Sequence, residues 1–185
     1  KFKVRSSIEK LIGPEYLIPL VKKWDDAMDI NPGDFPDYPV IVKCNHDSTG
    51  GVIVRDKSEV DFDSLRLDFA KRLKRNHYHQ TKEFQYKNIK PVVIMEKLLM
   101  DNKGRIPNDY KLHCFHGKVE FIYVSIDREG GNYRKIYSTD WKALPVIWTD
   151  KKDLDYKFIG NDIPAPDTLA KMIEIAETLS DGHQY

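Results

Sequence analysis

The chain has 185 residues, of which 41% are hydrophobic and 32% charged, and its formal net charge is +1. This is the composition of a water-soluble globular protein, and so small a net charge creates no global field that would favour nucleic acid or an anionic membrane. No apolar run approaches the ~20 residues that span a bilayer, and no export signal is visible. We therefore expect a cytoplasmic protein with one domain or two tightly coupled lobes.

The first half of the chain alternates short apolar runs with turn-rich segments. Apolar periodicity predicts helices at residues 3–13 and 61–76 and strands at 40–44, 52–54 and 91–95. In the second helix Phe62, Leu65, Phe69 and Leu73 share one face, and either Asp61 or Asp63 is placed to cap it. The segment from His77 to Lys90 is polar and aromatic and is expected to be irregular.

The second half begins with a loop and continues with alternating runs. Strands are predicted at residues 109–115, 119–126 and 133–137, and a helix at 167–179. Gly117 between the first two strands is a strong hairpin signal. The fold class is therefore α+β, with a helical lead-in at 1–33, a first lobe at 34–95 and a second lobe at 96–185. A ligand cleft is expected where the lobes meet, near Glu96 to Leu99.

Two cysteines and a pair of histidines are candidates for redox or metal sites. Cys44 and Cys114 both lie in apolar strand-like runs and lack metal-ligand spacing, so reduced core thiols are the favoured interpretation, although a disulfide stays open. His77 and His79 have no third ligand nearby in the sequence, which is typical of surface residues. No metal ligands are predicted within the chain.

The stretch with the clearest chemical signal is Lys43 to Val52, "KCNHDSTGGV". A loop that contains glycine can bring backbone N–H groups close to a phosphate. In a P-loop the lysine follows the glycines, and in a protein kinase the glycine loop precedes its lysine by a full strand. Here a lysine at the end of a strand comes first and a hairpin loop follows. Either this is a simple surface hairpin, or Lys43 reaches a phosphate while the loop folds over it.

That order resembles the ATP-grasp fold, and in particular its TupA-like branch, associated with teichuronopeptide biosynthesis. The resemblance runs in order from about residue 1 to 182 and is carried by a set of segments rather than by one motif. These segments are "VRSSIEKLIGPEYLIPL", "VIVKCNHDSTGGVIV", "EFQYKNIKPVVIMEKLL", "NDYKLHCFHGKVEFIYV", "IYSTDWKALP" and "LAKMIEIAETLSDG".

The resemblance implies roles for individual residues. Lys43, and Lys1 as a second lysine, would contact the nucleotide phosphates. The flap over the phosphates would be formed by the residues Asn45, His46, Ser48, Thr49, Gly50 and Gly51. Glu96, Lys97 and Leu99 would form the hinge that reads adenine through backbone groups, with Leu99 against the ring. Asp109 would accept hydrogen bonds from the ribose, and Lys111 and Arg128 would act in catalysis at the phosphate or acyl-phosphate region, or Arg128 would hold a substrate carboxylate.

The implied reaction is an ATP-dependent ligation with ATP and Mg²⁺. A carboxylate of a uronic acid or an amino acid attacks the γ-phosphate, and an amine then displaces the acyl phosphate to give an amide, in the synthesis of a bacterial surface polysaccharide. Such a reaction mainly requires positioning and neutralisation of charge. The sequence does not indicate which sugar or amine is used, or the oligomeric state.

Two departures from the family pattern keep alternatives open. Asp47 brings a negative charge into the loop, where it either points to solvent or helps to hold Mg²⁺. The metal carboxylates of ATP-grasp domains are expected on strands beyond Tyr185, so the chain is either a truncated ligase or a non-catalytic domain that binds nucleotide or glycan. A phosphotransferase of kinase type is a third possibility. Trp141 and Trp148 are expected in the core, with sugar stacking as the alternative, and Tyr86 is expected to pack.

Overall fold

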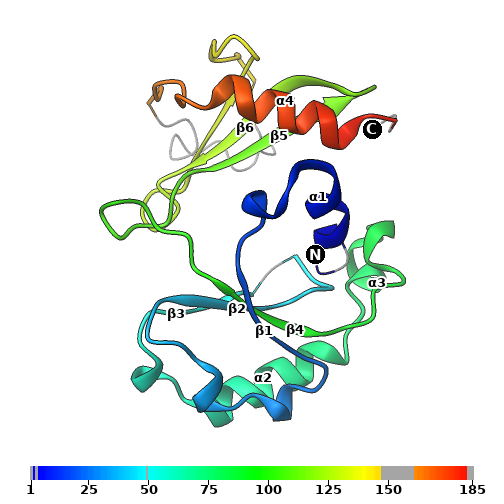
Figure 1. Cartoon of the computed structure of the whole chain (residues 1–185), viewed down its shortest axis with the longest axis vertical. Helices are drawn as coiled ribbons and strands as arrows, with labels where there is room; N and C mark the ends of the chain where they lie inside the picture. Colours follow the sequence, from blue (N-terminus) through cyan, green and yellow to red (C-terminus); the bar gives the residue numbers. More distant parts are fainter. Residues whose placement is uncertain (1, 3, 49, 147–160, 183–185) are drawn as a thin grey trace. The chain divides into compact units, whose positions relative to one another are not determined.

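The computed structural model describes residues 2, 4–48, 50–146 and 161–182. They belong to two compact units (Figure 1). The first unit comprises residues 1–9 and 15–98, and the second comprises residues 10–14 and 99–185. Each unit contains an antiparallel sheet with helical segments, as expected for an α+β protein.

The first unit is built on a four-stranded sheet of order β1-β4-β2-β3, in which all neighbours are antiparallel. Its strands are β1 (Leu20–Trp24), β2 (Val40–Cys44), β3 (Val52–Val54) and β4 (Val93–Lys97). The predictions for β2 and β3 are confirmed. No strand was predicted at β1, whose sequence "LVKKW" contains two lysines and whose pairing with β4 is irregular between Leu20 and Lys22.

The prediction for β4 was wrong by two residues. Pro91 has no N–H group to give to a ladder. The N–H of Val92 donates instead to the side chain of Asn45, at 2.9 Å. The strand therefore begins at Val93 and continues through Glu96, which lies opposite Ile41 of β2 and Leu20 of β1. As a consequence Glu96 is a buried strand residue rather than the solvated end of a strand.

Helix α2 (Phe62–Leu73) covers one face of this sheet, below it in Figure 1. Leu65 and Phe69 are buried on the predicted face of the helix. They pack into a core with alternate residues of β2. The buried members of this core are Trp24, Ala27, Ile30, Phe35, Val40, Val42, Cys44, Val54, Leu65, Phe69, Val93 and Met95. Ile41 and Lys43 alternate with these β2 residues and so face the other side of the sheet.

The N-terminus of α2 is capped by Asp61 rather than Asp63, since Oδ1 of Asp61 accepts from the Ser64 N–H at 3.0 Å. We expect Asp61→Ala to lower the free energy of unfolding by about 1 kcal/mol, the usual cost of losing such a cap. Urea denaturation followed by circular dichroism measures it. Asp63→Ala is the matched control, because the Asp63 side chain is exposed and pairs with Arg66 within the same helix. Equal effects of the two substitutions would contradict the cap.

The remaining helical segments of the first unit are short. Part of α1 (Val4–Ile12), which was predicted as a helix, belongs to this unit. The stretch expected to be irregular instead contains α3 (His77–Thr81) and a 3-10 turn at Phe84–Tyr86. Asn76 caps α3 by accepting from the Tyr78 N–H, a local signal that the sequence contained and the prediction overlooked. Other 3-10 turns of this unit lie at Ala27–Asp29, Pro32–Asp34 and Lys57–Glu59, and a further one, Pro14–Tyr16, begins with a residue assigned to the second unit.

The second unit is a three-stranded antiparallel meander of order β5-β6-β7, with one helix against it. The elements are β5 (Asp109–Phe115), β6 (Lys118–Ile126), β7 (Tyr133–Tyr137) and α4 (Leu169–Ser180). All four predictions are confirmed to within two residues. His116 and Gly117 both have positive φ, at 51° and 78°, which is the two-residue hairpin turn that the glycine indicated.

The two faces of this meander differ in chemistry. Helix α4 packs on one face, over a core that includes Val119, Ile122, Val124 and Tyr137. The predicted packing role of Trp141 is confirmed, because its ring stacks on Tyr137 with centroids 4.3 Å apart. The opposite face presents the other set of alternating residues, which are mostly polar. Among the described residues, none of the helices combines the length and apolar character needed to span a membrane.

Candidate functional site

Lys43 and Glu96 lie on the face of the first sheet that α2 leaves uncovered. Ile41 is opposite Glu96, so Lys43, two residues further along β2, is a diagonal neighbour of Glu96 on the same face. The Lys43 ammonium pairs with Oε2 of the Glu96 carboxylate. Glu96 as a residue is only 5% exposed, so its charge needs such a partner. The structure thus brings together two residues that lie far apart in the sequence.

A second cation, Arg5, completes what we call the Glu96 triad (Arg5, Lys43 and Glu96). Nη1 of Arg5 lies 3.0 Å from Oε1 of Glu96, and Nη2 donates to the Ile18 carbonyl at 2.7 Å. Each carboxylate oxygen therefore faces its own cation, and the triad carries a formal charge of +1. Sequence reasoning missed Arg5, because a lone arginine in a short helix gives no signal until its tertiary partner is known.

The predicted hinge residues Lys97 and Leu99 are placed differently from each other. The backbone N–H groups of Lys97 and Leu98 donate to the carbonyls of Pro19 and Pro39, each at 3.0 Å. These two donors are therefore used to fasten the end of β4. The Lys97 ammonium lies 5.7 Å from the centre of the Tyr38 ring, and Leu99 is half exposed. Adenine recognition by this segment stays a prediction.

The loop between β2 and β3 comprises residues 45–51. The side chain of its first residue makes hydrogen bonds like those of a strand backbone. Asn45 donates from its backbone N–H to the Val92 carbonyl at 3.1 Å. Its side-chain amide accepts from the Val92 N–H and donates to the Lys90 carbonyl, both at 2.9 Å. These contacts extend the pairing of β2 with β4 and fix where the loop begins.

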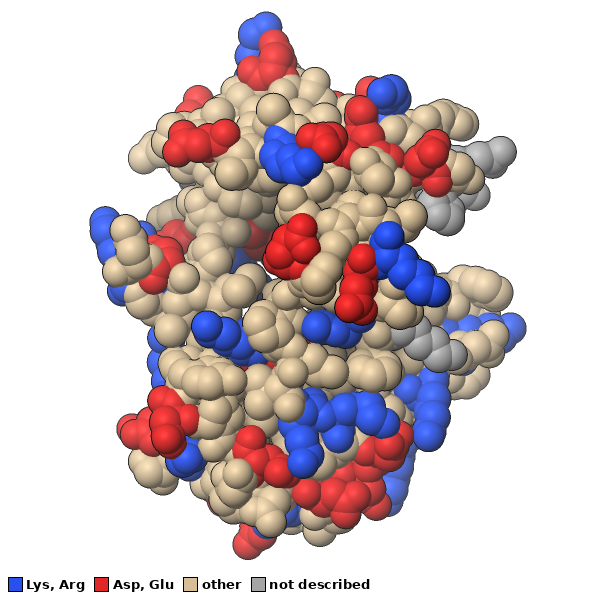
Figure 2. All heavy atoms as spheres, in the orientation of Figure 1, with Lys and Arg blue, Asp and Glu red and all other residues tan. Residues whose placement is uncertain are grey.

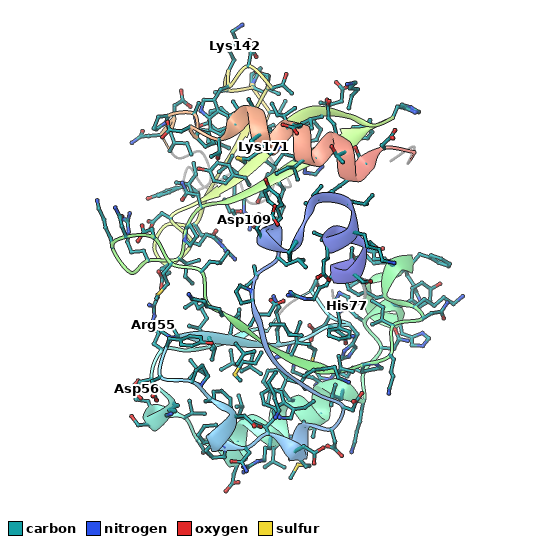
Figure 3. All side chains as sticks on the ribbon, in the orientation of Figure 1. Arg55, Asp56, His77, Asp109, Lys142 and Lys171 are labelled. Atoms are coloured by element: carbon teal, nitrogen blue, oxygen red, sulfur yellow. The ribbon has the colours of Figure 1, made fainter. Side chains whose placement is uncertain are left out.

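Other loop residues contact the C-terminal end of α2 and the segment after it. Buried His46 donates from Nε2 to the Arg72 carbonyl at 3.1 Å. The Ser48 hydroxyl lies 3.0 Å from Nε2 of His77, the first residue of α3 (Figure 3). His77 and Tyr86 also meet edge to face, with centroids 4.9 Å apart, which confirms the packing role expected for Tyr86.

Asp47, whose direction the sequence left open, does not point to solvent. Its Oδ2 accepts from Nη2 of Arg72 at 2.6 Å and from Nε at 3.2 Å. Nη1 of the same guanidinium donates to the Gly50 carbonyl. A single arginine of α2 thus holds both sides of the loop, and the negative charge of Asp47 is neutralised within the protein.

Both glycines of the loop are explained by packing. Gly50 has φ +77°, and a Cβ there would lie 2.8 Å from Cζ of Arg72. A Cβ on Gly51 would lie 2.9 Å from Cδ1 of Ile41. The glycines therefore let the loop lie against Arg72 and the sheet, a role distinct from the phosphate approach that the sequence suggested. A cavity of about 420 Å³ borders the loop on the Arg72 side.

In the second unit, three predicted site residues surround one cavity of about 490 Å³ on the face opposite α4. Asp109 begins β5 (Figure 3), and Lys111, two residues on, pairs with it on the same face. The Lys111 ammonium also lies 5.2 Å from the centre of the Tyr123 ring. Arg128 reaches the cavity from the turn after β6. The complete lining is Asp109, Lys111, His113, Tyr123, Ser125, Arg128, Asn132 and Arg134.

The turn that carries Arg128 is fixed by Asp127, which has φ +52°. Oδ2 of Asp127 accepts from the Gly131 N–H at 2.9 Å, and its backbone N–H donates to the Asn108 side chain at 3.2 Å. A Cβ on Gly130 would lie 2.3 Å from Oδ2 of Asp127. The sequence "DREGGN" thus forms a turn that is fixed by hydrogen bonds and holds Arg128 beside the cavity.

Sequence reasoning missed Arg134, Tyr123 and Ser125 in this cavity. Arg134 lies opposite Ser125, and Tyr123 opposite Lys111, so all three share the face of Asp109. A signal was present, because in "FIYVSI" the aromatic and polar residues alternate with Ile122, Val124 and Ile126. The sequence alone does not give the register of the three strands, and the register decides which of their residues are neighbours.

His113, in the same cavity, should show a shifted titration. Burial, with a smaller effect of the Lys111 charge, lowers the pKa of His113 below its ordinary value of 6.5. Because the folded chain gives up this proton more readily than the unfolded chain, the stability from this group is complete above about pH 6.5 and declines as the pH falls below it. Titration of the imidazole by NMR should give a pKa below 6.5, and His113→Gln should flatten the pH dependence of unfolding in that window. A pKa at or above 6.5 would contradict it.

The remaining predictions concern metals and residues outside the described part. The described residues contain no group of three or more His, Cys, Asp or Glu side chains suited to a metal. Cys44 and Cys114 are free thiols, as expected. Lys1, Thr49 and Trp148 lie outside the described residues. On the face drawn in Figure 2, described acidic and basic side chains are interspersed, which agrees with the small net charge.

Comparison with known proteins identifies the family. The family model for TupA-like ATPgrasp proteins matches residues 1–185, which is the whole chain. No curated protein and no solved structure gave a significant match. The matched range includes both sheets, the Glu96 triad, the 45–51 loop and the polar cavity of the second unit. The chain therefore belongs to the TupA-like ATP-grasp family.

Proposed function

We propose that this protein is an ATP-dependent carboxylate–amine ligase that forms an amide through an acyl phosphate, in the synthesis of a bacterial surface polysaccharide. Membership of the ATP-grasp family supports a ligase in general. The observation that supports nucleotide binding is the Glu96 triad. It keeps Lys43, a lysine on a strand, beside the loop that is predicted to cover the phosphates. The substrate half, a uronic-acid or amino-acid carboxylate and an amine, rests on the resemblance described above.

In this proposal Lys43 turns from Glu96 to the phosphates when ATP binds. The change is electrostatically feasible because Arg5 stays paired with the other oxygen of Glu96, so the buried carboxylate is never left without a cation. The net positive charge of the triad attracts the triphosphate. Glu96 and the following residues, including Leu99, provide the adenine-binding segment.

The cavity of the second unit supplies the remaining roles. Asp109 accepts from the ribose hydroxyls, and its pairing with Lys111 keeps both side chains on one face of the sheet. Lys111 and Arg128 neutralise negative charge on the transferred phosphoryl group or on the substrate carboxylate, with Arg134 beside them. Cations of this kind are the main protein contribution to phosphoryl transfer, which depends on positioning and charge stabilisation.

The proposed reaction has two steps. A carboxylate oxygen of the substrate attacks the γ-phosphorus of ATP, and the bond from that phosphorus to the β–γ bridging oxygen breaks to release ADP. The amine then attacks the acyl carbon, the C–O bond to phosphate breaks, and the amine loses a proton as the amide forms. ATP-grasp enzymes generally use Mg²⁺, and the described residues contain no cluster of metal ligands. Because the proposed reaction consumes ATP, we propose that it takes place in the cytoplasm.

The test is ADP and phosphate release by the purified protein with ATP, Mg²⁺ and a panel of uronic acids or amino acids and amines. A ligase releases phosphate only when a carboxylate and an amine are both present. Nucleotide binding without turnover for any pair would instead support a non-catalytic binding domain. A phosphorylated product that persists when every amine is withheld would support a kinase.

A further inference from the structure

Arg72 is a charged residue in the apolar stripe of α2, and the structure shows what it contacts there. The residue is only 9% exposed, and its guanidinium carbon lies 4.8 Å from the centre of the Phe69 ring. Its guanidinium donates to Asp47 and to the Gly50 carbonyl of the 45–51 loop, and it also lies 3.7 Å from Oδ2 of Asp68 on its own helix. Its backbone carbonyl accepts from His46 of the same loop. One helix residue thus holds three residues of the loop.

We propose that Arg72 is a positioning residue for nucleotide binding, which fixes the 45–51 loop and cancels the charge of Asp47 so that the loop can cover a triphosphate. This inference rests on the proposed function, because it concerns the loop predicted to act as the phosphate flap. Arg72 itself faces the α2 side of the loop, and Lys43 the opposite face of the sheet.

The charge of Asp47 is the reason that one arginine matters so much. A carboxylate in a loop that closes over phosphates repels them, unless a cation neutralises it. Arg72 gives Asp47 two hydrogen bonds from one fork, and the side chain of Asp47 is only 15% exposed, so solvent screens the pair weakly. The contact with Gly50 also fixes the position of the loop, because the same guanidinium donates to a carbonyl on the other side of the loop.

A merely structural role makes a different prediction. If Arg72 only stabilised the fold, Arg72→Met and Asp47→Asn would lower the free energy of unfolding and leave the KM for ATP unchanged. If it positions a loop and cancels a charge, Arg72→Met should be worse than Asp47→Asn, since it releases the loop and also uncovers the carboxylate. The double variant should then bind ATP better than Arg72→Met alone.

The experiment compares Arg72→Met, Arg72→Lys, Asp47→Asn and the double variant with Arg66→Met as the matched control. Arg66 lies on the same helix but donates to the Ile30 carbonyl and pairs with Asp63, away from the loop. We expect Arg72→Met to raise the KM for ATP by about 10- to 100-fold, the worth of hydrogen bonds to a charged group. Asp47→Asn in that background should restore part of the affinity, and Arg66→Met should leave the KM unchanged.

Hydrogen exchange gives a readout that does not depend on turnover. Amides of residues 45–51 should exchange faster in Arg72→Met than in Arg66→Met at equal global stability. An unchanged KM and unchanged loop exchange in Arg72→Met would overturn the inference, and so would a double variant no better than Arg72→Met. If Arg72→Met does not fold, Arg72→Lys decides, because it keeps the charge but loses the fork and should give an intermediate KM with faster loop exchange. Absence of any ATP-dependent turnover or nucleotide binding in the wild type would instead refute the proposed function.

Discussion

Replacing Lys43 by alanine is expected to reduce ATP-dependent ADP release by about 100- to 1,000-fold, the usual cost of removing one group that stabilises developing charge. In the proposed function, Lys43 is the cation of the Glu96 triad that turns toward phosphate while Arg5 keeps Glu96 paired. The measurement is steady-state ADP release with saturating substrates, together with the affinity for a non-hydrolysable ATP analogue. Both should fall, because in the proposed function the lysine contacts the nucleotide before and during transfer.

Lys23→Ala is the control for this substitution. Lys23 lies opposite Ile94 in the same sheet, on the face of Lys43, but its ammonium pairs with Asp25 near the surface. It has no proposed contact with ATP, and its removal should leave turnover unchanged. Unchanged turnover in Lys43→Ala, with the folded state intact, would refute the assignment of the loop and its lysine.

Glu96→Ala is expected to lower the free energy of unfolding by about 3 kcal/mol, the low end of the range for a broken buried ion pair. The substitution leaves Arg5 and Lys43 as neighbouring cations without the carboxylate that separates them. The low end applies because their side chains keep 18% and 23% exposure and so retain some hydration. Urea denaturation monitored by tryptophan fluorescence measures the change, and Trp24 in the core of this unit is a suitable reporter.

A second pair of variants separates charge from packing in this result. Glu96→Gln keeps the shape and should lose much of the same stability, because a neutral amide does not compensate two cations. Arg5→Met added to Glu96→Gln should recover part of the loss by removing one of the unpaired charges. A loss below about 0.5 kcal/mol for Glu96→Ala, the range of ordinary surface substitutions, would contradict the structural role of the triad.

The fold could be predicted where one face of an element is apolar and the other polar. The stripe of Leu65 and Phe69 determined α2, and the glycine turn at Gly117 determined the hairpin of β5 and β6. β1 could not be predicted from its own sequence. The adjacent charged residues Lys22 and Lys23 interrupt the apolar pattern of a strand, and its pairing with β4 is irregular. The start of β4 depends on a side chain from elsewhere, since Asn45 takes the N–H of Val92 that a strand would otherwise use.

In the candidate site, too, some residues could be predicted from the sequence and others could not. Lys43 could be singled out because it lies near the end of a strand and precedes a glycine loop, whereas Asp109 and Lys111 are indicated only by the family resemblance. Arg5 and Arg72 could not be assigned, because each acts on a residue at least 25 positions away, and only the folded chain shows the partner. Arg72 did leave a trace in the sequence, as a charged residue in the buried stripe of α2.

Transfer of oxygen-18 from the substrate carboxylate tests the central claim most directly. The acyl-phosphate route requires that the bridging oxygen comes from the carboxylate and leaves with the phosphate. With an ¹⁸O-labelled carboxylate, ATP and an amine that supports turnover, mass spectrometry of the released phosphate should therefore find one labelled oxygen for each amide formed. Phosphate without label, or AMP and pyrophosphate in place of ADP and phosphate, would contradict the mechanism proposed for this protein.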